Sequence, residues 1–290
     1  MKAVAETVTV AAVNFRPRFG AIGENLERIE AWVADLAGRG ASLICFPELA
    51  VTGYDRTPAI RELAQTVPGP AADRLAAIAQ RWRADVLAGL PERDADGRLY
   101  IAQIIAGADG AMAVYRKLHL NAPERATYTP GEALGVFRRP NLTCGVQLCY
   151  DAHFPELSTL QALAGADLLC IASASPRDEP EEKAERMLRY LRARAYDNSC
   201  YVVACNLVGE GAQGQRFGGV ALALDPKGEL LASHVGWEEG YVLATVDMAA
   251  LRRIRRTVMG YFLPHRRADL YRRLAEQIGR DGSEEHHVVP

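Results

Sequence analysis

Three residues with chemically useful side chains stand just beyond stretches that are typical of buried strands. The stretches are 41–46, 111–116 and 142–148, and the residues beyond them are Glu48, Lys117 and Cys149. A carboxylic acid, an amine and a thiol supply a general base, a cation that stabilises negative charge, and a nucleophile. Because sites in open α/β sheets assemble at the carboxyl ends of strands, we expect these side chains to meet there and to perform acyl transfer.

Each of these residues has a simpler explanation when it is considered alone. A lysine or glutamate at a strand end is usually a solvated charge, and a cysteine in an apolar run is usually a buried thiol. The segment GVQLCYDAHFPE around Cys149 nevertheless reads as a strand turning into a helix, because Pro155 suits the first turn of a helix. Such a turn presents a side chain and brings backbone N–H groups near it, as an oxyanion site requires.

The elements that must position these residues follow from hydrophobic periodicity. Apolar residues recur at helical spacing between Leu26 and Leu36. The strand-like runs 99–106 and 111–116 are joined by GADG, a hairpin signal, so the sheet is predicted to be mixed. Further strands are expected at 7–14, 85–90, 167–172 and 200–206, and further helices at 71–82, 155–164 and 181–198.

The C-terminal third is predicted to form a β-meander and a short helix. The meander comprises 221–224, 229–233 and 241–246, and the helix is capped by Asp247 and ends at Arg256. The glycine-rich segment 208–219 lacks a phosphate-binding spacing and reads as a mobile loop.

Two other polar segments have predicted roles. The segment Asn121 to Glu132 is long enough to line a site. In the helix 181–198, Arg192 and Arg194 are expected to pair with acids on or near that helix, such as Glu181, Glu182 or Glu185.

The composition is that of an ordinary globular chain. Of the 290 residues, 49% are hydrophobic and 24% are charged, and the net charge of −2 favours neither nucleic acid nor an anionic membrane as a partner. The six cysteines form no CxxC pair and mostly lie in apolar runs, which favours reduced thiols over disulfides or a zinc site.

No apolar run approaches the ~20 residues of a membrane span, and no secretory signal is recognisable. We expect a cytoplasmic protein with one domain over 1–279 and a polar, disordered tail over 280–290.

Three segments together resemble the signature blocks of the nitrilase, or carbon–nitrogen hydrolase, superfamily. They are FPELAVTGY around Glu48, YRKLHL around Lys117 and GVQLCYDAHFPE around Cys149, in the order and spacing of that family. Further resemblance runs through RARAYDNSCYVVACNLVG, DPKGELL and RRADLY, so it covers almost the whole chain, from Thr7 to Leu274.

The resemblance implies an α/β fold, a four-layer α–β–β–α sandwich with two mixed β-sheets, and a Glu-Lys-Cys triad. It makes Glu48 the general base, Lys117 the electrostatic stabiliser and Cys149 the nucleophile. Glu124, in the loop that ends TPG, matches a second, supporting glutamate, with an exposed loop glutamate as the alternative. Family members pair through helices beside the site, which implies a homodimer or a larger homo-oligomer. The chemistry needs neither a metal nor an organic cofactor.

The implied function is hydrolysis of a non-peptide C–N bond in a small amide or N-carbamoyl compound, through a thioester on Cys149. A nitrilase acting on a C≡N bond is the alternative on the same fold, because the attacking residues would be the same. An acyl-transferring or Cys-His thiol enzyme would instead need His119 or His153 as its base. A catalytically silent scaffold is the remaining alternative, and the presence of all three reactive residue types argues against it.

Several neighbours are candidates for supporting roles. The backbone N–H of Tyr150 would help to bind the oxyanion. Tyr54 could offer its hydroxyl to a substrate or a glutamate, with plain packing as the alternative. His153 could border the pocket, and Asn206 could support it from the end of a strand. His119 is expected to form structural hydrogen bonds.

Overall fold

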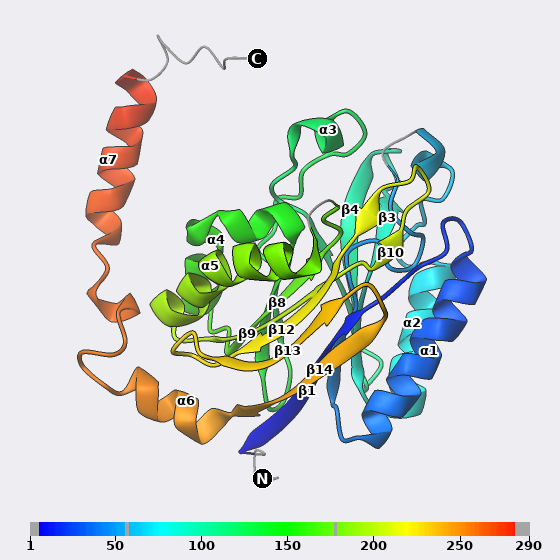
Figure 1. The fold of residues 1–290 in the computed structure, drawn as a ribbon. Helices are drawn as coiled ribbons and strands as arrows, with labels where there is room; N and C mark the ends of the chain where they lie inside the picture. Colours follow the sequence, from blue (N-terminus) through cyan, green and yellow to red (C-terminus); the bar gives the residue numbers. More distant parts are fainter. Residues whose placement is uncertain (1–5, 56–57, 177–178, 282–290) are drawn as a thin grey trace.

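Two β-sheets packed face to face between helices make up the body of the molecule (Figure 1). The computed structural model describes residues 6–55, 58–176 and 179–281. Helices α1 (Ile22–Gly38) and α2 (Pro70–Trp82) cover one sheet, and helices α4 (Pro155–Leu163) and α5 (Pro180–Asn198) cover the other. The predicted four-layer α–β–β–α sandwich with two mixed sheets is therefore confirmed.

The first sheet has six strands in the order β14-β1-β2-β3-β4-β5. Strands β1, β2 and β3 are parallel to one another, and the remaining pairs are antiparallel. The strands are β1 (Thr7–Asn14), β2 (Leu43–Cys45), β3 (Asp85–Arg93), β4 (Leu99–Ala106), β5 (Met112–Arg116) and β14 (Gly240–Asp247). Glu48 follows β2 and Lys117 follows β5, so this sheet carries both of them.

The second sheet has six strands in the order β13-β12-β9-β8-β7-β6. Strands β7, β8 and β9 run parallel, and antiparallel strands flank them. The strands are β6 (Val136–Arg138), β7 (Thr143–Leu148), β8 (Leu168–Ser173), β9 (Tyr201–Asn206), β12 (Gly219–Leu224) and β13 (Leu230–Gly236). Cys149 follows β7 directly, so the thiol comes from the opposite sheet to Glu48 and Lys117.

Apolar side chains fill all three interfaces between the layers. The middle cluster lies between the sheets and takes Val10 and Leu43 from one and Val146 from the other. The outer clusters bury the apolar stripes of the helices, such as Ile29 and Val33 of α1. The helical spacing of these residues is what places one face of α1 on the sheet.

Gly89 of β3 lets the segment that carries Glu48 lie directly on the first sheet. A Cβ atom at this position would overlap the backbone nitrogen of Leu49 and lie 3.0 Å from the carbonyl carbon of Glu48. The N–H of Val51 donates to the carbonyl oxygen of Gly89 at 2.9 Å. The ladder of β2 therefore ends at Cys45, and the chain beyond it forms a turn against β3.

The predicted C-terminal meander is wrong in its last strand. Strand β14 leaves β13 and pairs with β1 in the other sheet, from Thr7↔Asp247 to Asn14↔Gly240. The parallel core of that sheet leaves β1 with a free edge along its full length, and β14 satisfies its backbone groups. The segment predicted as a mobile glycine-rich loop contains a short ladder of β10 (Gly209–Glu210) and β11 (Arg216–Phe217).

The chain leaves the sandwich after β14. Helix α6 (Met248–Arg255) is capped by Asp247, whose Oδ1 accepts the N–H of Ala250 at 2.8 Å, as predicted. Helix α7 (Ala268–Asp281) stands apart from the sandwich in Figure 1. Of the predicted tail, 280–281 continue α7 and 282–290 lie outside the described residues. Within the described ranges, no helix has the length and apolar character needed to cross a membrane.

Candidate active site

Cys149 stands at a strained turn between β7 and a 3-10 helix (Cys149–His153) that leads into α4. Its φ of 44° lies in the left-handed region, which is costly for a residue with a Cβ atom. All six cysteines are free thiols, and only Cys149 is not fully buried. The predicted strand-to-helix turn is thus present, and it separates Cys149 from the five core thiols.

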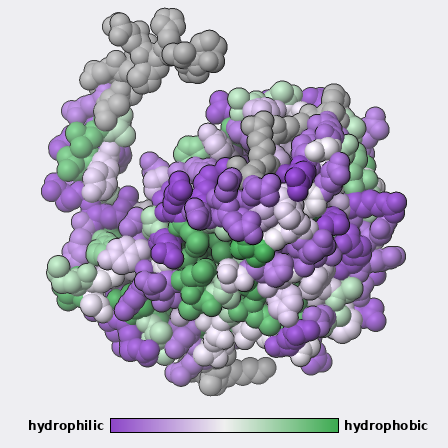
Figure 2. Space-filling view, viewed as in Figure 1, coloured by the Kyte–Doolittle hydropathy of each residue, from purple (hydrophilic) through white to green (hydrophobic). Residues whose placement is uncertain are grey.

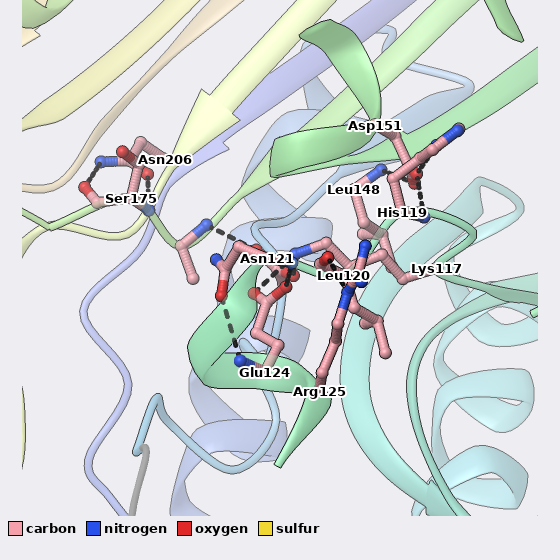
Figure 3. A network of polar contacts seen from close by, with 12 residues as sticks. Lys117, His119, Leu120, Asn121, Glu124, Arg125, Leu148, Asp151, Ser175 and Asn206 are labelled. Atoms are coloured by element: carbon pink, nitrogen blue, oxygen red, sulfur yellow. Dashed lines mark hydrogen bonds and ion pairs between the residues drawn. The ribbon is translucent and has the colours of Figure 1, made fainter. Parts of the chain in front are cut away.

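Asp151 holds this turn in place. Its buried carboxylate accepts the N–H of Leu148 at 3.0 Å and the hydroxyl of Tyr115 at 2.7 Å on Oδ2. On Oδ1 it accepts the backbone N–H of His119 at 2.9 Å, and the His119 ring nitrogen Nδ1 also lies at 2.9 Å (Figure 3). The carboxylate therefore joins the segment after Lys117 to the turn of Cys149.

Lys117 lies between two carboxylates. Its Nζ is 2.7 Å from Oε1 of Glu48 and 2.8 Å from Oε1 of Glu124, and all three side chains are buried. Glu124 is in turn fixed by a reciprocal cap with Asn121 in helix α3 (Ala122–Arg125): each residue's side chain accepts the other's backbone N–H at 3.0 Å (Figure 3). Glu124 is therefore not the exposed loop glutamate of the alternative interpretation, and Lys117 is not a solvated charge.

The backbone of Ala174, just beyond β8, closes the cluster. Its N–H donates to Oε2 of Glu48 at 3.0 Å, and the same backbone lies near enough to the Cys149 thiol to lower its pKa. Cys149 also interacts electrostatically with Glu48, Lys117 and Glu124. The predicted convergence of an acid, a cation and a thiol is thus present where the ends of strands from the two sheets meet.

Asn206 supports the Ala174 segment rather than the thiol itself. Its Oδ1 accepts the N–H of Ser175 at 2.9 Å, and its Nδ2 donates to the carbonyl oxygens of Ser175 at 3.1 Å and Gly218 at 2.8 Å. The buried ammonium of Lys183 also donates to the Ser175 carbonyl oxygen. Two side chains therefore fix the residue that follows Ala174.

Desolvation and charge set the protonation states of the cluster. Desolvation raises the pKa of the Cys149 thiol to about 12, and the Glu48 carboxylate adds to the rise while Lys117 opposes it. Burial raises the pKa of Glu48 to about 7, although the Lys117 ammonium pulls it down. Burial alone would lower the pKa of Lys117, but the negative charges of Glu48 and Glu124 raise it above its usual value. Near neutral pH the site therefore holds a protonated thiol, an ammonium and a partly ionised Glu48. The ionised form of Glu48 can accept a proton.

The aromatic neighbours lie around the turn. Tyr54 is buried and packs edge-on against Phe217, with ring centroids 5.5 Å apart. Tyr150 is exposed and packs edge-on against the Phe154 ring, with centroids 5.3 Å apart. His153 lies against the Tyr190 ring at 4.7 Å, and burial lowers its pKa. Tyr190 in turn interacts electrostatically with Cys149.

His119 and Arg194 both contact residues of the turn that follows Cys149. The His119 ring stacks on Phe154 at 3.8 Å in addition to its contact with Asp151, which agrees with the predicted structural role. The predicted pairing of Arg194 with acids of its own helix gives way to a different contact. Its Nε donates to the carbonyl oxygen of Ala152 at 3.1 Å and its Nη2 to that of His153 at 3.3 Å. Backbone oxygens of a buried turn need donors, and Arg194 supplies them.

Sequence reasoning missed Asp151 and Ala174. Asp151 carried a readable signal, since an acid two residues after a strand-end cysteine has few partners in an apolar turn other than backbone N–H groups. Ala174 carried none, because it contributes only its backbone. No cluster of three or more His, Cys, Asp or Glu side chains suited to a metal ion occurs in the part of the chain that the structure describes.

Comparison with known proteins gives a consistent family. The model of the carbon–nitrogen hydrolase family matches residues 9–256. The "Nitrilase" of Pyrococcus abyssi is 31% identical over 91% of this chain and 99% of its own length. The omega-amidase of Xenopus tropicalis is 31% identical over 86% of this chain and 91% of its own length.

Solved structures share the fold. A mutant of the Nesterenkonia AN1 amidase from the nitrilase superfamily superposes with a TM-score of 0.78, at 27% identity over 94% of this chain and 99% of that chain. A carbon–nitrogen hydrolase from Helicobacter pylori superposes with a TM-score of 0.83 over 93% of this chain and 98% of that chain, at 24% identity. The chain therefore belongs to the nitrilase, or carbon–nitrogen hydrolase, superfamily, and it is a carbon–nitrogen hydrolase.

Proposed function

We propose that this protein hydrolyses a non-peptide C–N bond in a small amide or N-carbamoyl compound, with Cys149 as the nucleophile. The observation that carries the proposal is the buried ammonium of Lys117, held between Glu48 and Glu124 and acting electrostatically on the Cys149 thiol. A cation in this position favours any reaction that places negative charge beside the thiol.

In the first half-reaction, the Cys149 thiol attacks the carbonyl carbon of the substrate. Because the pKa of the thiol is far above neutrality, the thiolate forms only as Glu48 takes the proton. The C–S bond forms and the carbonyl oxygen becomes an oxyanion, which Lys117 Nζ and the backbone N–H of Tyr150 would stabilise. When the C–N bond breaks, Glu48 returns the proton to the departing nitrogen, and a thioester on Cys149 remains.

In the second half-reaction, water replaces the departed amine. Glu48, ionised again, takes a proton from the water while the oxygen of the water bonds to the thioester carbon. Collapse of this intermediate breaks the C–S bond, releases the carboxylic acid and returns the proton from Glu48 to the Cys149 sulfur. Glu48 therefore transfers a proton in four steps, and a pKa of about 7 suits it to both directions.

The relatives support an amide as the substrate. The omega-amidase of Xenopus tropicalis and the Nesterenkonia AN1 amidase are named for amide hydrolysis. The Pyrococcus abyssi relative carries the name nitrilase, so nitrile hydrolysis is the alternative to be tested. A Cys-His mechanism receives less support, because His119 is committed to Asp151 and Phe154.

The test is a panel of small amides, N-carbamoyl compounds and nitriles assayed for ammonia release. Cys149→Ala is the blank, and Glu48→Gln and a His119→Ala/His153→Ala double variant separate the two candidate bases. We expect ammonia from amides, or ammonia with carbon dioxide from carbamoyl compounds, and its loss in Glu48→Gln. Turnover of nitriles alone would replace the proposal, as would activity that survives Glu48→Gln but not loss of the histidines.

We also propose that the protein forms a homodimer or larger homo-oligomer in the cytoplasm. Leu160 and Leu163 of α4 and Tyr196 of α5 are large apolar side chains exposed on the outer helical layer. Such residues are candidates for an interface when they lie on one layer. The six free thiols are in keeping with a reducing compartment.

A further inference from the structure

Tyr128 has a buried hydroxyl without a hydrogen-bond partner. Among the described residues, four buried side-chain atoms lack a partner: Oε1 of Gln103, Oη of Tyr128, Oε1 of Gln147 and Oδ1 of Asn198. The three amides each still donate a hydrogen bond through their nitrogen atom. The hydroxyl is the only polar atom of the Tyr128 side chain, so in this set Tyr128 alone forms no side-chain hydrogen bond.

The backbone around Tyr128 is tied to the residues that carry the charges of the site. Its N–H donates to the carbonyl oxygen of Glu124 at 2.9 Å, just beyond α3. Three residues later, the N–H of Gly131 donates to the carbonyl oxygen of Lys117 at 2.8 Å. The ring belongs to the cluster between the sheets, together with Leu49 and Tyr54, and is 8% exposed. Its position is therefore fixed relative to Glu124 and Lys117.

The phenol also lies in the field of the site's charges. Burial raises its pKa well above the usual value, and the carboxylates of Glu48 and Glu124 raise it further without accepting a hydrogen bond from it. The hydroxyl thus remains neutral, and it can both donate and accept. Leaving a buried hydroxyl unpaired is destabilising, and a polar ligand atom at this point would remove that cost.

We propose that the Tyr128 hydroxyl binds the atom that faces Glu48 during turnover, which is the substrate nitrogen first and the oxygen of the hydrolytic water afterwards. This inference rests on the proposed function. The nitrogen that receives a proton from Glu48 and the water that later gives one to Glu48 must occupy the same place beside that carboxyl group. Each carries a second hydrogen, and the Tyr128 oxygen, which interacts electrostatically with Glu48, is an unpaired acceptor among the described residues.

Tyr128 neither gains nor loses a proton in this scheme. In acylation, one N–H of the substrate would point at the Tyr128 oxygen while Glu48 donates a proton to the nitrogen as the C–N bond breaks. In deacylation, one O–H of the water would point at Tyr128 while Glu48 accepts the other proton as the C–O bond forms. The hydroxyl therefore orients the lone pair of the water toward the thioester carbon.

Tyr128→Phe tests the inference, with Tyr100→Phe as the matched control. Tyr100 is also a buried ring, but its hydroxyl bonds Asp94 in the β3–β4 hairpin. The first measurement is turnover of an amide substrate. The second uses a p-nitrophenyl ester, which acylates Cys149 without an amine and reports acylation as a burst and deacylation as the steady rate. The third is the ratio of hydroxamate to acid when hydroxylamine competes with water for the acyl-enzyme.

We expect Tyr128→Phe to lower amide turnover and ester deacylation by about 10- to 100-fold, in line with one lost hydrogen bond in the transition state. The burst amplitude should persist, and the ratio of hydroxamate to acid should change little, because hydroxylamine presents its nitrogen to Glu48 and Tyr128 as water presents its oxygen. The unfolding temperature should equal or exceed that of the wild type, because an unpaired hydroxyl has been removed. Tyr100→Phe should leave all three kinetic measurements within about twofold.

Rates of amide turnover and ester deacylation within twofold of the wild type for Tyr128→Phe would overturn the inference. The same holds if deacylation falls equally in Tyr100→Phe. A wild type that gives an ester burst but releases no ammonia from any substrate in the panel would contradict the proposed function instead, and the deacylation rate would still decide the role of Tyr128.

Discussion

At the scale of single residues, Glu48 determines how the activity should depend on pH. Its pKa is raised to about 7, and the proposed base must be ionised to take the thiol proton. The value of kcat/KM should therefore rise with pH, with a midpoint near 7, and level off above it. The raised pKa values of Lys117 and Cys149 keep the ammonium and the thiol protonated well above that midpoint, so no alkaline decline is expected below about pH 10.

Glu124→Gln provides the control for this pH profile. Glu124 raises the pKa of Glu48 by charge repulsion, so its neutralisation should move the midpoint of kcat/KM to lower pH. An amide oxygen at this position can still accept a hydrogen bond from Lys117. A midpoint that stays in place, or an activity that falls between pH 6 and 8, would contradict the assignment of Glu48 as the base.

Lys117→Ala should lower kcat by on the order of a hundred- to a thousandfold, since removal of one group that stabilises an oxyanion commonly has this effect. It should also destabilise the fold, because Glu48 and Glu124 lose their buried cation. The loss of stability should be greater at pH 8 than at pH 5, since Glu48, whose pKa is raised to about 7 even beside the cation, can take up a proton at the lower pH.

The measurements are steady-state kinetics and thermal unfolding at both pH values. Lys227→Ala, in the exposed turn after β12, is the matched control. Turnover close to that of the wild type in Lys117→Ala would exclude an electrostatic role for this lysine.

At the scale of elements, Asp151 joins the loops of two strands from different sheets. It accepts hydrogen bonds from Leu148, at the end of β7, and from His119, two residues past Lys117. An asparagine has only one oxygen to replace two that accept hydrogen bonds. We expect Asp151→Asn to reduce kcat by at least tenfold with a smaller change in KM, because the distance between the thiol and Lys117 would no longer be held.

Tyr115→Phe is a milder test of the same carboxylate. It removes one of the hydrogen bonds to the carboxylate, at 2.7 Å, and leaves those from the backbone. Its effect on kcat should therefore have the same sign and be smaller. If Asp151→Asn lowers the unfolding temperature but leaves kcat unchanged, the carboxylate serves only the stability of the turn.

The sequence predicted these elements well where local patterns decide them. The helix over Leu26 to Leu36 and the strand that ends at Leu148 required only periodicity and a turn signal. The predicted meander was wrong in its last strand because the pairing of strands depends on tertiary packing, not only on the neighbouring sequence. The strand 240–247 pairs with β1, more than 200 residues earlier, and nothing in its own residues states that preference. The same is true of Ala174, whose backbone N–H reaches Glu48.

At the scale of the whole molecule, the site is divided between the two sheets. Glu48 and Lys117 follow strands of the first sheet, while Cys149 and Ala174 follow strands of the second. The packing of the core between the sheets therefore sets the spacing between Glu48, the proposed base, and Cys149, the proposed nucleophile. The sequence indicated which residues meet, through motifs that resemble a known family, but the division between sheets depends on strand orders that no local pattern encodes.

Helix α7 bears on the assembly of the molecule. It projects away from the sandwich in Figure 1, and the space-filling view shows it exposed to solvent (Figure 2). Tyr271 and Leu274 are 51% and 42% exposed, and with Leu270 they lie on one side of the helix. A helix that exposes apolar residues and stands apart from its own chain gains stability by packing on a second copy. We therefore expect α7 to contribute to the proposed homo-oligomer.

A Tyr271→Gln/Leu274→Gln double variant tests this role, with Arg272→Gln/Glu276→Gln on the opposite side of α7 as the matched control. Burial of one large apolar side chain contributes about 1.5–3 kcal/mol, so the apolar pair should shift the dissociation constant of the assembly by at least tenfold toward the monomer. Sedimentation velocity over a range of concentrations measures this shift. The control should keep the mass of the wild type, since charged residues that remain in water contribute little. A wild type that sediments as a monomer would refute the oligomer itself, whereas an oligomer of unchanged mass in both variants would place its interface elsewhere, such as on α4 and α5.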